Sequence, residues 1–301
     1  MRTMVIVSVL SLTLAACSNE SETTNVAEPM PGATESTTAP APMTEESSVA
    51  DAGLEDVLNH ERRADNRARD EWRNPMETLS FFGIESDMTI GEVLPGNGGW
   101  YTQILNPFTA ERGRLIGLTY PESLFRQMFG TWDEAAVERI GADTYYMDRY
   151  LSVEGVDRVQ PIVGYAIDNI PDATNGQGNA VLFFRAMHHL FRFDEPLIDT
   201  ALSEVYDMLG SGGVVGVVQH RAPETSAADF ASGNNGYVKQ SAVVAAFERA
   251  GFILEATSEL NANPNDPADS FVWRLPPTRN NNPETLAIGE SDRMTLRFRK
   301  P

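Results

Sequence analysis

The feature that most constrains this chain is a strand that runs directly into a glycine-rich turn and then a helix. Residues 89–94 have the pattern of a strand, residues 95–99 read Pro-Gly-Asn-Gly-Gly, and a helix is expected over residues 100–105. Glycines in such a turn let backbone N–H groups approach a ligand, and the N-terminus of the next helix favours negative charge. We therefore expect a ligand-binding site where this strand ends.

Strands and helices alternate along the rest of the chain. Residues 179–184 are continuously apolar, which is typical of a strand buried on both faces of a sheet. Other strands are expected at 114–119, 159–163, 213–219, 252–260 and 294–299. Further helices are expected at 54–72, 76–82, 121–130, 132–140, 197–209 and 239–250. Because this order builds βαβ units, the sequence predicts an α/β fold, with a Rossmann-like, mostly parallel seven-stranded sheet and helices on both faces.

The N-terminal segment has a different composition. A basic residue and an apolar run precede Cys17, and the run is shorter than the about 20 apolar residues of a transmembrane helix, so residues 1–16 are expected to be a signal peptide. Residues 18–53 contain no aromatic and no basic side chain, and such a segment cannot offset the entropy cost of ordering. We expect a disordered acidic tether over 17–53 and one folded domain over 54–301.

The segment Leu14-Ala15-Ala16-Cys17 resembles the lipobox of bacterial lipoproteins. That resemblance implies that Cys17 is acylated, and Ser18 in place of aspartate implies sorting to the outer membrane. Because Cys17 is the one cysteine of the chain, an intrachain disulfide and a thiolate zinc cluster are excluded. We therefore expect an exported protein held by lipid at the periplasmic face of the outer membrane. The alternative is an ordinary signal peptide followed by a chance cysteine.

The net charge limits the class of partner. The chain carries 23 Lys and Arg against 43 Asp and Glu, which gives a net charge of −20. Nucleic-acid binding needs a cationic surface, so this balance argues against it, and also against electrostatic docking on anionic lipid. A small-molecule ligand or substrate is the expected partner, and the sequence leaves the oligomeric state open.

The turn itself carries a family resemblance. Glu92 followed by Gly96 and Gly98 resembles motif one of the class I S-adenosyl-L-methionine (SAM) methyltransferases, and the order of elements resembles their fold. Residues 74–83, 95–102, 220–223 and 288–294 together resemble a family of exported bacterial proteins described as predicted methyltransferases. The resemblance implies a class I methyltransferase sheet, closed by a late antiparallel strand, with SAM as cofactor.

The same resemblance implies where the cofactor would bind. Leu94 stands at the first glycine position of the motif, and Thr119 and Tyr165 stand where the family places acids that contact the ribose and the adenine, with Asp168 nearby. Glu92 has an alternative role as a buried acid bonded to loop amides, and Trp100 and Tyr101 have one in helix packing. The cofactor-binding residues are expected to be Glu92, Gly96, Asn97, Gly98, Gly99, Trp100, Tyr101, Thr119, Tyr165 and Asp168.

Candidate catalytic residues follow the fourth and fifth strands. Arg185 and His188 come after residues 179–184, and His220 follows residues 213–219, so all three belong to the edge where open α/β sheets bind ligands. A histidine there can act as a general base, although packing is the alternative role. The chain has no HExxH or His-x-x-x-His pair, so no metal is expected.

Other enzyme classes fit less well. The chain has no Gly-x-Ser-x-Gly elbow of a serine hydrolase, and Tyr101 stands where the dinucleotide fingerprint needs its third glycine. The sequence therefore favours a SAM-dependent methyltransferase anchored as a lipoprotein, with an unknown acceptor. The alternative is a non-catalytic or differently acting small-molecule-binding periplasmic lipoprotein on the same fold, since SAM is made in the cytoplasm and fold does not fix function.

Overall fold

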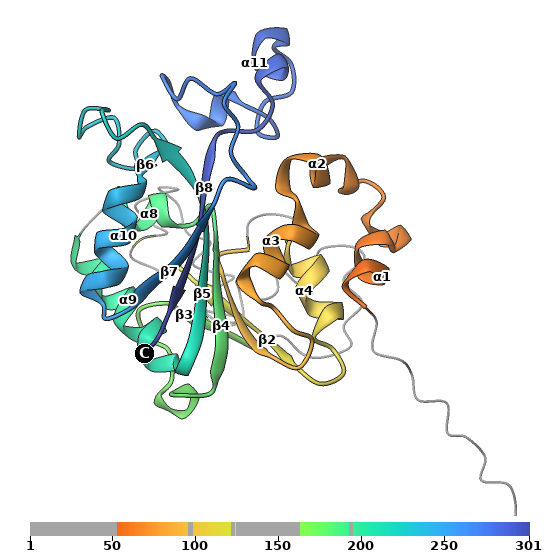
Figure 1. The fold of residues 1–301 in the computed structure, drawn as a ribbon, viewed down its shortest axis with the longest axis vertical. Coiled ribbons are helices and arrows are strands. Elements are labelled where there is room, and N and C mark those ends of the chain that lie inside the picture. The colour runs from red at the N-terminus through yellow and green to blue at the C-terminus, as the bar shows by residue number, and fades with distance from the viewer. Residues whose placement is uncertain (1–52, 96–98, 122–123, 125–162, 193–194) are drawn as a thin grey trace, which may run out of the picture. The chain divides into compact units, whose positions relative to one another are not determined.

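The computed structural model describes residues 53–95, 99–121, 124, 163–192 and 195–301 (Figure 1). Several sequence predictions lie outside these residues: the signal peptide, Cys17, the tether up to residue 52, most of the helices expected at 121–130 and 132–140, and the turn residues Gly96, Asn97 and Gly98. Within the described residues, no helix is both long and apolar enough to cross a membrane.

A single mixed sheet forms the centre of the fold. Its strands are β1 (Thr89–Val93), β2 (Arg114–Thr119), β3 (Val163–Ala166), β4 (Gly178–Phe184), β5 (Leu209–Ala222), β6 (Val238–Lys239), β7 (Ile253–Ser258) and β8 (Arg293–Arg299). They lie in the order β3-β2-β1-β4-β5-β8-β7, and β6 pairs with the end of β5 outside this path. The first five strands pair in parallel, whereas β8 runs antiparallel between β5 and β7.

This strand order is the one that the resemblance to class I methyltransferases implies. It confirms the predicted α/β class, the mostly parallel sheet and the late antiparallel strand. The described part of the third strand is Val163–Ala166, and residues 159–162 of the predicted strand lie outside the described residues. The sheet has eight strands rather than the predicted seven, because the short β6 has no counterpart in the sequence prediction. Strand β6 has only two residues, too few for a periodic pattern to reveal it.

Helices cover both faces of the sheet. The helices of the described chain are α1 (Leu54–Asn59), α2 (Asp70–Arg73), α3 (Pro75–Phe82), α4 (Thr102–Phe108), α8 (Met187–Phe191), α9 (Glu195–Met208), α10 (Gln240–Arg249) and α11 (Pro283–Ile288). Short 3₁₀ turns stand at η1 (Glu61–Arg63), η2 (Arg67–Arg69), η3 (Asp172–Thr174) and η4 (Val272–Arg274). Helices α1, α3 and α4 lie on one side of the sheet and α9 and α10 on the other (Figure 1).

Strand β4 shows why the sheet needs cover on both sides. Its side chains alternate between two hydrophobic cores: Val181 and Phe183 pack with residues of α9 and α10, whereas Leu182 and Phe184 pack with residues of α3 and α4. All four are buried, so the strand reads as one apolar run rather than an alternating one. This burial on both faces explains the continuous apolar run within residues 179–184 of the sequence.

The segment before α3 departs from the single helix expected at 54–72. Here the chain breaks into α1, two 3₁₀ turns and α2, and Asn74 then adopts a left-handed conformation with φ of 40° ahead of Pro75. Arg63 is fully buried within the segment, where it donates to the carbonyl of Leu58 and to Asp70. A charged side chain that folds inward interrupts the helical register, and tertiary contacts decide where it does so.

Candidate functional site

The predicted site residues gather along one edge of the sheet. Because β1 to β5 are parallel, their carboxyl ends meet at the same edge, which is where open α/β sheets bind ligands. Glu92 lies near the end of β1, Thr119 ends β2, and Tyr165 lies in β3. Arg185 follows β4 directly, and His220 lies near the end of β5. Residues from five separate parts of the chain are thereby brought to the same edge of the sheet.

Glu92 is a buried acid held by the helix that follows the turn. Its side chain is 2% exposed, and the Thr102 hydroxyl in the first turn of α4 donates a 2.7 Å hydrogen bond to Glu92 Oε2. Burial raises the pKa of Glu92 to about 8, although the bond from Thr102 lowers it. A carboxyl with this pKa mostly holds its proton at neutral pH, and a cationic ligand group beside it would favour release of that proton.

On either side of the turn after β1, one residue has left-handed backbone: Leu94 before it and Gly99 after it. Leu94 has φ of 42°, the conformation that glycine would supply at low cost, and its N–H donates to the carbonyl of Leu118 at 2.7 Å. A leucine in this region stores about 1–3 kcal/mol of strain, and such strain is often found at functional sites. At the other end, Gly99 has φ of 48°, and a Cβ there would lie 3.0 Å from the side chain of Thr102. Gly99 therefore leaves room for the threonine that bonds Glu92.

Trp100 and Tyr101 are packed into the core beside this turn. The Trp100 indole N–H donates to the carbonyl of Asn66 at 3.1 Å, and the Tyr101 ring stacks on Phe184 with centroids 3.4 Å apart. Both side chains are buried and belong to the core between the sheet and α1, α3 and α4. These contacts give the two residues a packing role, and contact with a cofactor stays a prediction.

Thr119, Tyr165 and Asp168 lie where the nucleoside end of the cofactor is expected. The buried Thr119 hydroxyl donates to the carbonyl of Tyr165 at 3.2 Å, so it ties β2 to β3. Asp168 lies in the turn after β3, where partial burial raises the pKa of its carboxyl. Of these three residues, only Asp168 has a carboxyl that could contact the nucleoside.

His188, in α8, and His220, near the end of β5, lie close together. Their ring centroids are 5.5 Å apart. The backbone N–H of His188 donates to Gln219 Oε1 at 3.3 Å, and His220 Nδ1 lies 2.5 Å from the Ser291 hydroxyl. Burial lowers the pKa of His188 to about 3 and that of His220 well below its usual range. Both rings are therefore neutral at physiological pH and can accept a hydrogen bond from a bound molecule.

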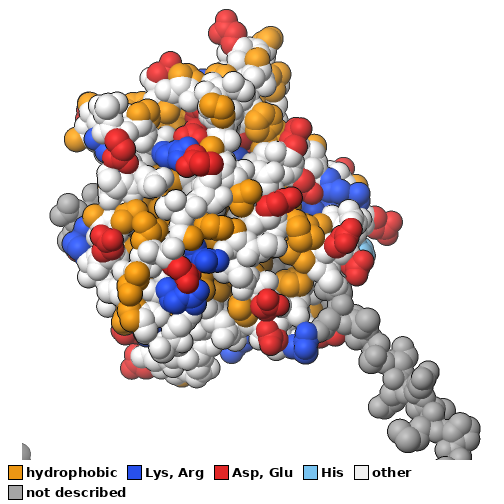
Figure 2. All heavy atoms as spheres, in the orientation of Figure 1, with side chains coloured by type: hydrophobic (Ala, Val, Ile, Leu, Met, Phe, Trp, Pro, Cys, Tyr) orange, Lys and Arg blue, Asp and Glu red, His pale blue; other side chains and the backbone are white. Residues whose placement is uncertain are grey.

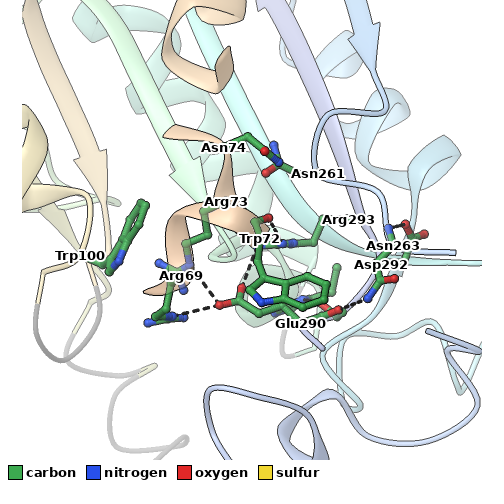
Figure 3. A network of polar contacts seen from close by, with 12 residues as sticks. Arg69, Trp72, Arg73, Asn74, Trp100, Asn261, Asn263, Glu290, Asp292 and Arg293 are labelled. Carbon is green, nitrogen blue, oxygen red and sulfur yellow. Dashed lines mark hydrogen bonds and ion pairs between the residues drawn. The ribbon is translucent and has the colours of Figure 1, made fainter. Parts of the chain in front are cut away.

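The structure also shows a charge network that the sequence analysis did not assign to the site (Figure 3). Glu290 pairs with Arg69 at 3.0 Å, with Arg73 at 3.4 Å and with Arg293 at 3.0 Å. Burial alone would raise the pKa of Glu290, but Arg73, Arg293 and Arg69 bring it down to about 2. Arg185 adds a further positive charge to this group. The available signal was the segment at 288–294, which resembled the family but carried no assigned role.

The described residues form a further pocket but no metal-binding cluster. No group of three or more His, Cys, Asp or Glu side chains among them is placed to hold a metal ion. A pocket of about 280 Å³ lies beside the end of β5, lined by residues that include Arg221, Asp266 and Asp292. Arg221 is bonded to both Glu259 and Asp292, so its charge is matched within the protein.

Comparison with known proteins gives a likeness at the level of solved structures. No protein-family model matches the chain, and no curated protein matches it. A SAM-dependent methyltransferase from Aquifex aeolicus is 13% identical, with 68% of this chain and 92% of that chain covered and a TM-score of 0.46. Geranyl diphosphate C-methyltransferase from Streptomyces coelicolor A3(2) is 12% identical, with coverage of 81% and 87% and a TM-score of 0.48. The [4+2]-cyclase SpnF is 14% identical, with coverage of 76% and 80% and a TM-score of 0.47.

Proposed function

We propose that this chain is a SAM-dependent methyltransferase that acts on a small molecule. The observation that carries the proposal is Glu92, a buried acid near the end of β1. It is followed by Leu94 and Gly99, both with left-handed backbone, in the strand order of the class I methyltransferase fold. That position suits the ammonium of the methionine part of SAM, which would pair with the Glu92 carboxylate. Asp168, with its partly buried carboxyl, would contact the nucleoside part.

The chemistry asks the protein mainly for position. When bound, SAM supplies a sulfonium methyl group that transfers readily to a nucleophile. Holding donor and acceptor in line is then the main contribution of the protein. His188 and His220, both neutral at physiological pH, would accept a hydrogen bond from the acceptor, and the lowered pKa of each ring makes it a weak base.

Calorimetry with the purified full-length chain and S-adenosylhomocysteine tests this function. We expect binding near micromolar affinity at pH 7.5. We also expect proton release, seen as a difference in heat between HEPES and Tris buffers, because a ligand ammonium beside Glu92 lowers its raised pKa. Glu92→Gln should abolish that release and weaken binding about ten- to hundredfold, since a charge-assisted hydrogen bond is worth about 1.5–3 kcal/mol.

A matched control separates this effect from a general change of charge. Glu77 lies exposed on α3, so Glu77→Gln should leave both affinity and proton release unchanged. Absence of heat at millimolar S-adenosylhomocysteine would contradict the proposal. It would favour the second candidate, a small-molecule-binding protein on the same fold. The specific observation behind that candidate is Thr119, which stands where the family places an acid that contacts the ribose. Its hydroxyl already donates to the backbone carbonyl of Tyr165.

We also propose that the protein is exported and held by lipid on Cys17 at the periplasmic face of the outer membrane. The support is the sequence alone: the lipobox-like segment Leu14 to Cys17, the following Ser18, and the acidic segment that separates them from the folded domain. Several acyl chains on one cysteine give a stable anchor, whereas a single chain binds only marginally.

A further inference from the structure

The network around Glu290 holds more positive than negative charge. Arg69, Arg73 and Arg293 pair with this one carboxylate, and Arg185 lies within electrostatic reach of it. Figure 3 shows the side chains of Arg69 and Arg73 converging on Glu290 from one side. Burying a charge is costly unless it is paired, so four guanidinium groups around one carboxylate leave a positive excess that an anion would offset.

Arg73 carries the clearest sign of a missing partner. Its side chain is 1% exposed, and neither Nη1 nor Nη2 has a hydrogen-bond partner. Its Nε reaches Glu290 at 3.4 Å, and the guanidinium lies 4.6 Å from the centre of the Trp100 ring. Buried polar groups are nearly always hydrogen-bonded, so two free ends of a buried guanidinium fork point to a ligand with oxygen acceptors.

Arg185 gives an independent sign at the same place. It follows β4 in a left-handed conformation with φ of 58°, a costly geometry for an arginine. Within the described part of the chain, its side chain forms no hydrogen bond or ion pair. Burial lowers the pKa of Arg185 to about 10; the charge of Glu290 raises it, and those of Arg69 and Arg293 lower it further. The left-handed backbone of Arg185 therefore has an energetic cost, and it holds a guanidinium without a hydrogen-bond partner near Arg73.

Two members of the cluster, Arg69 and Arg185, are in contact with solvent. The side chain of Arg69 is 24% exposed and one of its buried nitrogens, Nη2, also has no hydrogen-bond partner. Arg185 is only partly buried. His220 pairs in register with Arg293 across β5 and β8, so the two neutral histidines border the same group of charges.

We propose that Arg73 and Arg185, with Arg69 and Arg293 beside them, form a receptor for an anionic group of a small molecule, a carboxylate or a phosphate. Planar guanidinium forks bind both groups through paired N–H donors, which a lysine could not do. Arg185 follows β4 and Arg293 begins β8, so in the strand order these two residues lie on the other side of β1 from Thr119 and Tyr165. The inference concerns the anion alone and does not depend on methyl transfer.

Thermal unfolding of the full-length chain in inorganic phosphate tests the receptor. Phosphate is titrated at constant ionic strength against sodium chloride. We expect a saturable rise of the melting temperature in phosphate, because a ligand that binds only the native state stabilises it by mass action. Arg185→Gln and Arg73→Gln should each raise the half-saturating phosphate concentration at least tenfold. Arg249→Gln is the matched control, since Arg249 is exposed on α10 and pairs with Asp199.

A purely structural role for Arg73 predicts a different result for Arg73→Gln than anion binding does. If Arg73 only supports the fold, Arg73→Gln lowers the melting temperature in chloride and leaves the phosphate response unchanged. If it serves an anion, the variant in chloride melts no lower than the native protein, since Glu290 keeps Arg69 and Arg293 as partners. A native protein that responds equally to phosphate and chloride, or two variants that keep the full phosphate response, would overturn the proposal. Should one variant fail to fold, the other still decides.

Saturating S-adenosylhomocysteine distinguishes two sources of the anion. If the phosphate effect adds to that of S-adenosylhomocysteine, the receptor serves a second ligand such as the methyl acceptor. If S-adenosylhomocysteine abolishes the phosphate effect, the receptor holds the donor's own carboxylate. If S-adenosylhomocysteine does not change the melting temperature and phosphate still does, the proposed methyl transfer is contradicted and the proposed anion receptor is supported.

Discussion

Thr102 donates a 2.7 Å hydrogen bond from its hydroxyl to Glu92 Oε2, and this bond joins the first turn of α4 to the end of β1. Both side chains are buried. The bond satisfies one oxygen of a carboxyl that would otherwise lie without a partner in the core. It also fixes the helix that follows the glycine turn, so the geometry of the candidate site depends on it.

Replacing Thr102 by valine should therefore destabilise the protein. Valine keeps the shape but leaves the buried Glu92 oxygen unsatisfied, which costs about 1–3 kcal/mol. The free energy of unfolding in urea at pH 7 measures the effect. Thr278→Val is the matched control, because Thr278 is exposed and should change the stability little. Equal stability of the two variants would show that the bond contributes nothing.

Glu92 should make stability fall as the pH rises. Its pKa is about 8 in the folded protein against 4.5 as the ordinary value, so the native state binds the proton more tightly than the unfolded state. The stability from this group is complete below about pH 4.5 and is lost progressively as the pH rises to about 8. Glu92→Gln removes this dependence, so its melting temperature should exceed that of the native protein increasingly between pH 5 and about 8. Parallel curves for the two proteins would rule out the raised pKa.

Glu290 should be the most sensitive residue of the charge network. Glu290→Gln leaves the surrounding arginines without their carboxylate, and breaking a buried pair in this way costs about 3–5 kcal/mol. Urea unfolding measures the loss. The double variant with Arg73→Gln should recover part of it, because one of the unpaired charges is then removed. A double variant as unstable as the sum of the two single variants would contradict this account.

Glu290 should also make the stability of the folded protein fall at low pH. The pKa of Glu290 is about 2 in the folded protein, below its ordinary value of 4.5, because its arginine partners outweigh the effect of burial. The stability it provides is present above about pH 4.5 and is lost as the pH falls towards 2. Melting temperatures of the native protein and of Glu290→Gln should therefore converge as the pH is lowered through this range. A constant difference between them would contradict the lowered pKa.

Lipid attachment makes a prediction for the N-terminus. Cys17→Ser should release the protein from the membrane fraction, because the hydroxyl cannot take the place of the acylated thiol. Fractionation of cells in high salt, followed by detection of the chain in pellet and supernatant, measures this. Ser18→Ala is the control and should stay with the membranes. If the Cys17→Ser protein still pellets with membranes in high salt, the anchor lies elsewhere or does not exist.

The sequence by itself determined the elements that local patterns specify. The strand at residues 114–119 lies where the sequence predicts it, and the apolar run at 179–184 forms the buried strand β4. The predicted glycine turn correctly placed Glu92 at the end of the first strand. These features follow from side chains a few residues apart, because burial on one or both faces of a strand leaves a regular pattern along the chain.

The tertiary structure alone decided how the charges meet. Arg69 and Glu290 are 221 positions apart, and they come together because β8 inserts antiparallel beside β5 and brings its first residue to the edge where the parallel strands end. Residues 54–72 have the spacing and mixed charge of one helix, yet Arg63 within them and Arg73 directly after them are buried. A local pattern records which side chains are apolar on average, whereas the pairing of buried charges depends on partners that only the folded chain brings within a few ångströms.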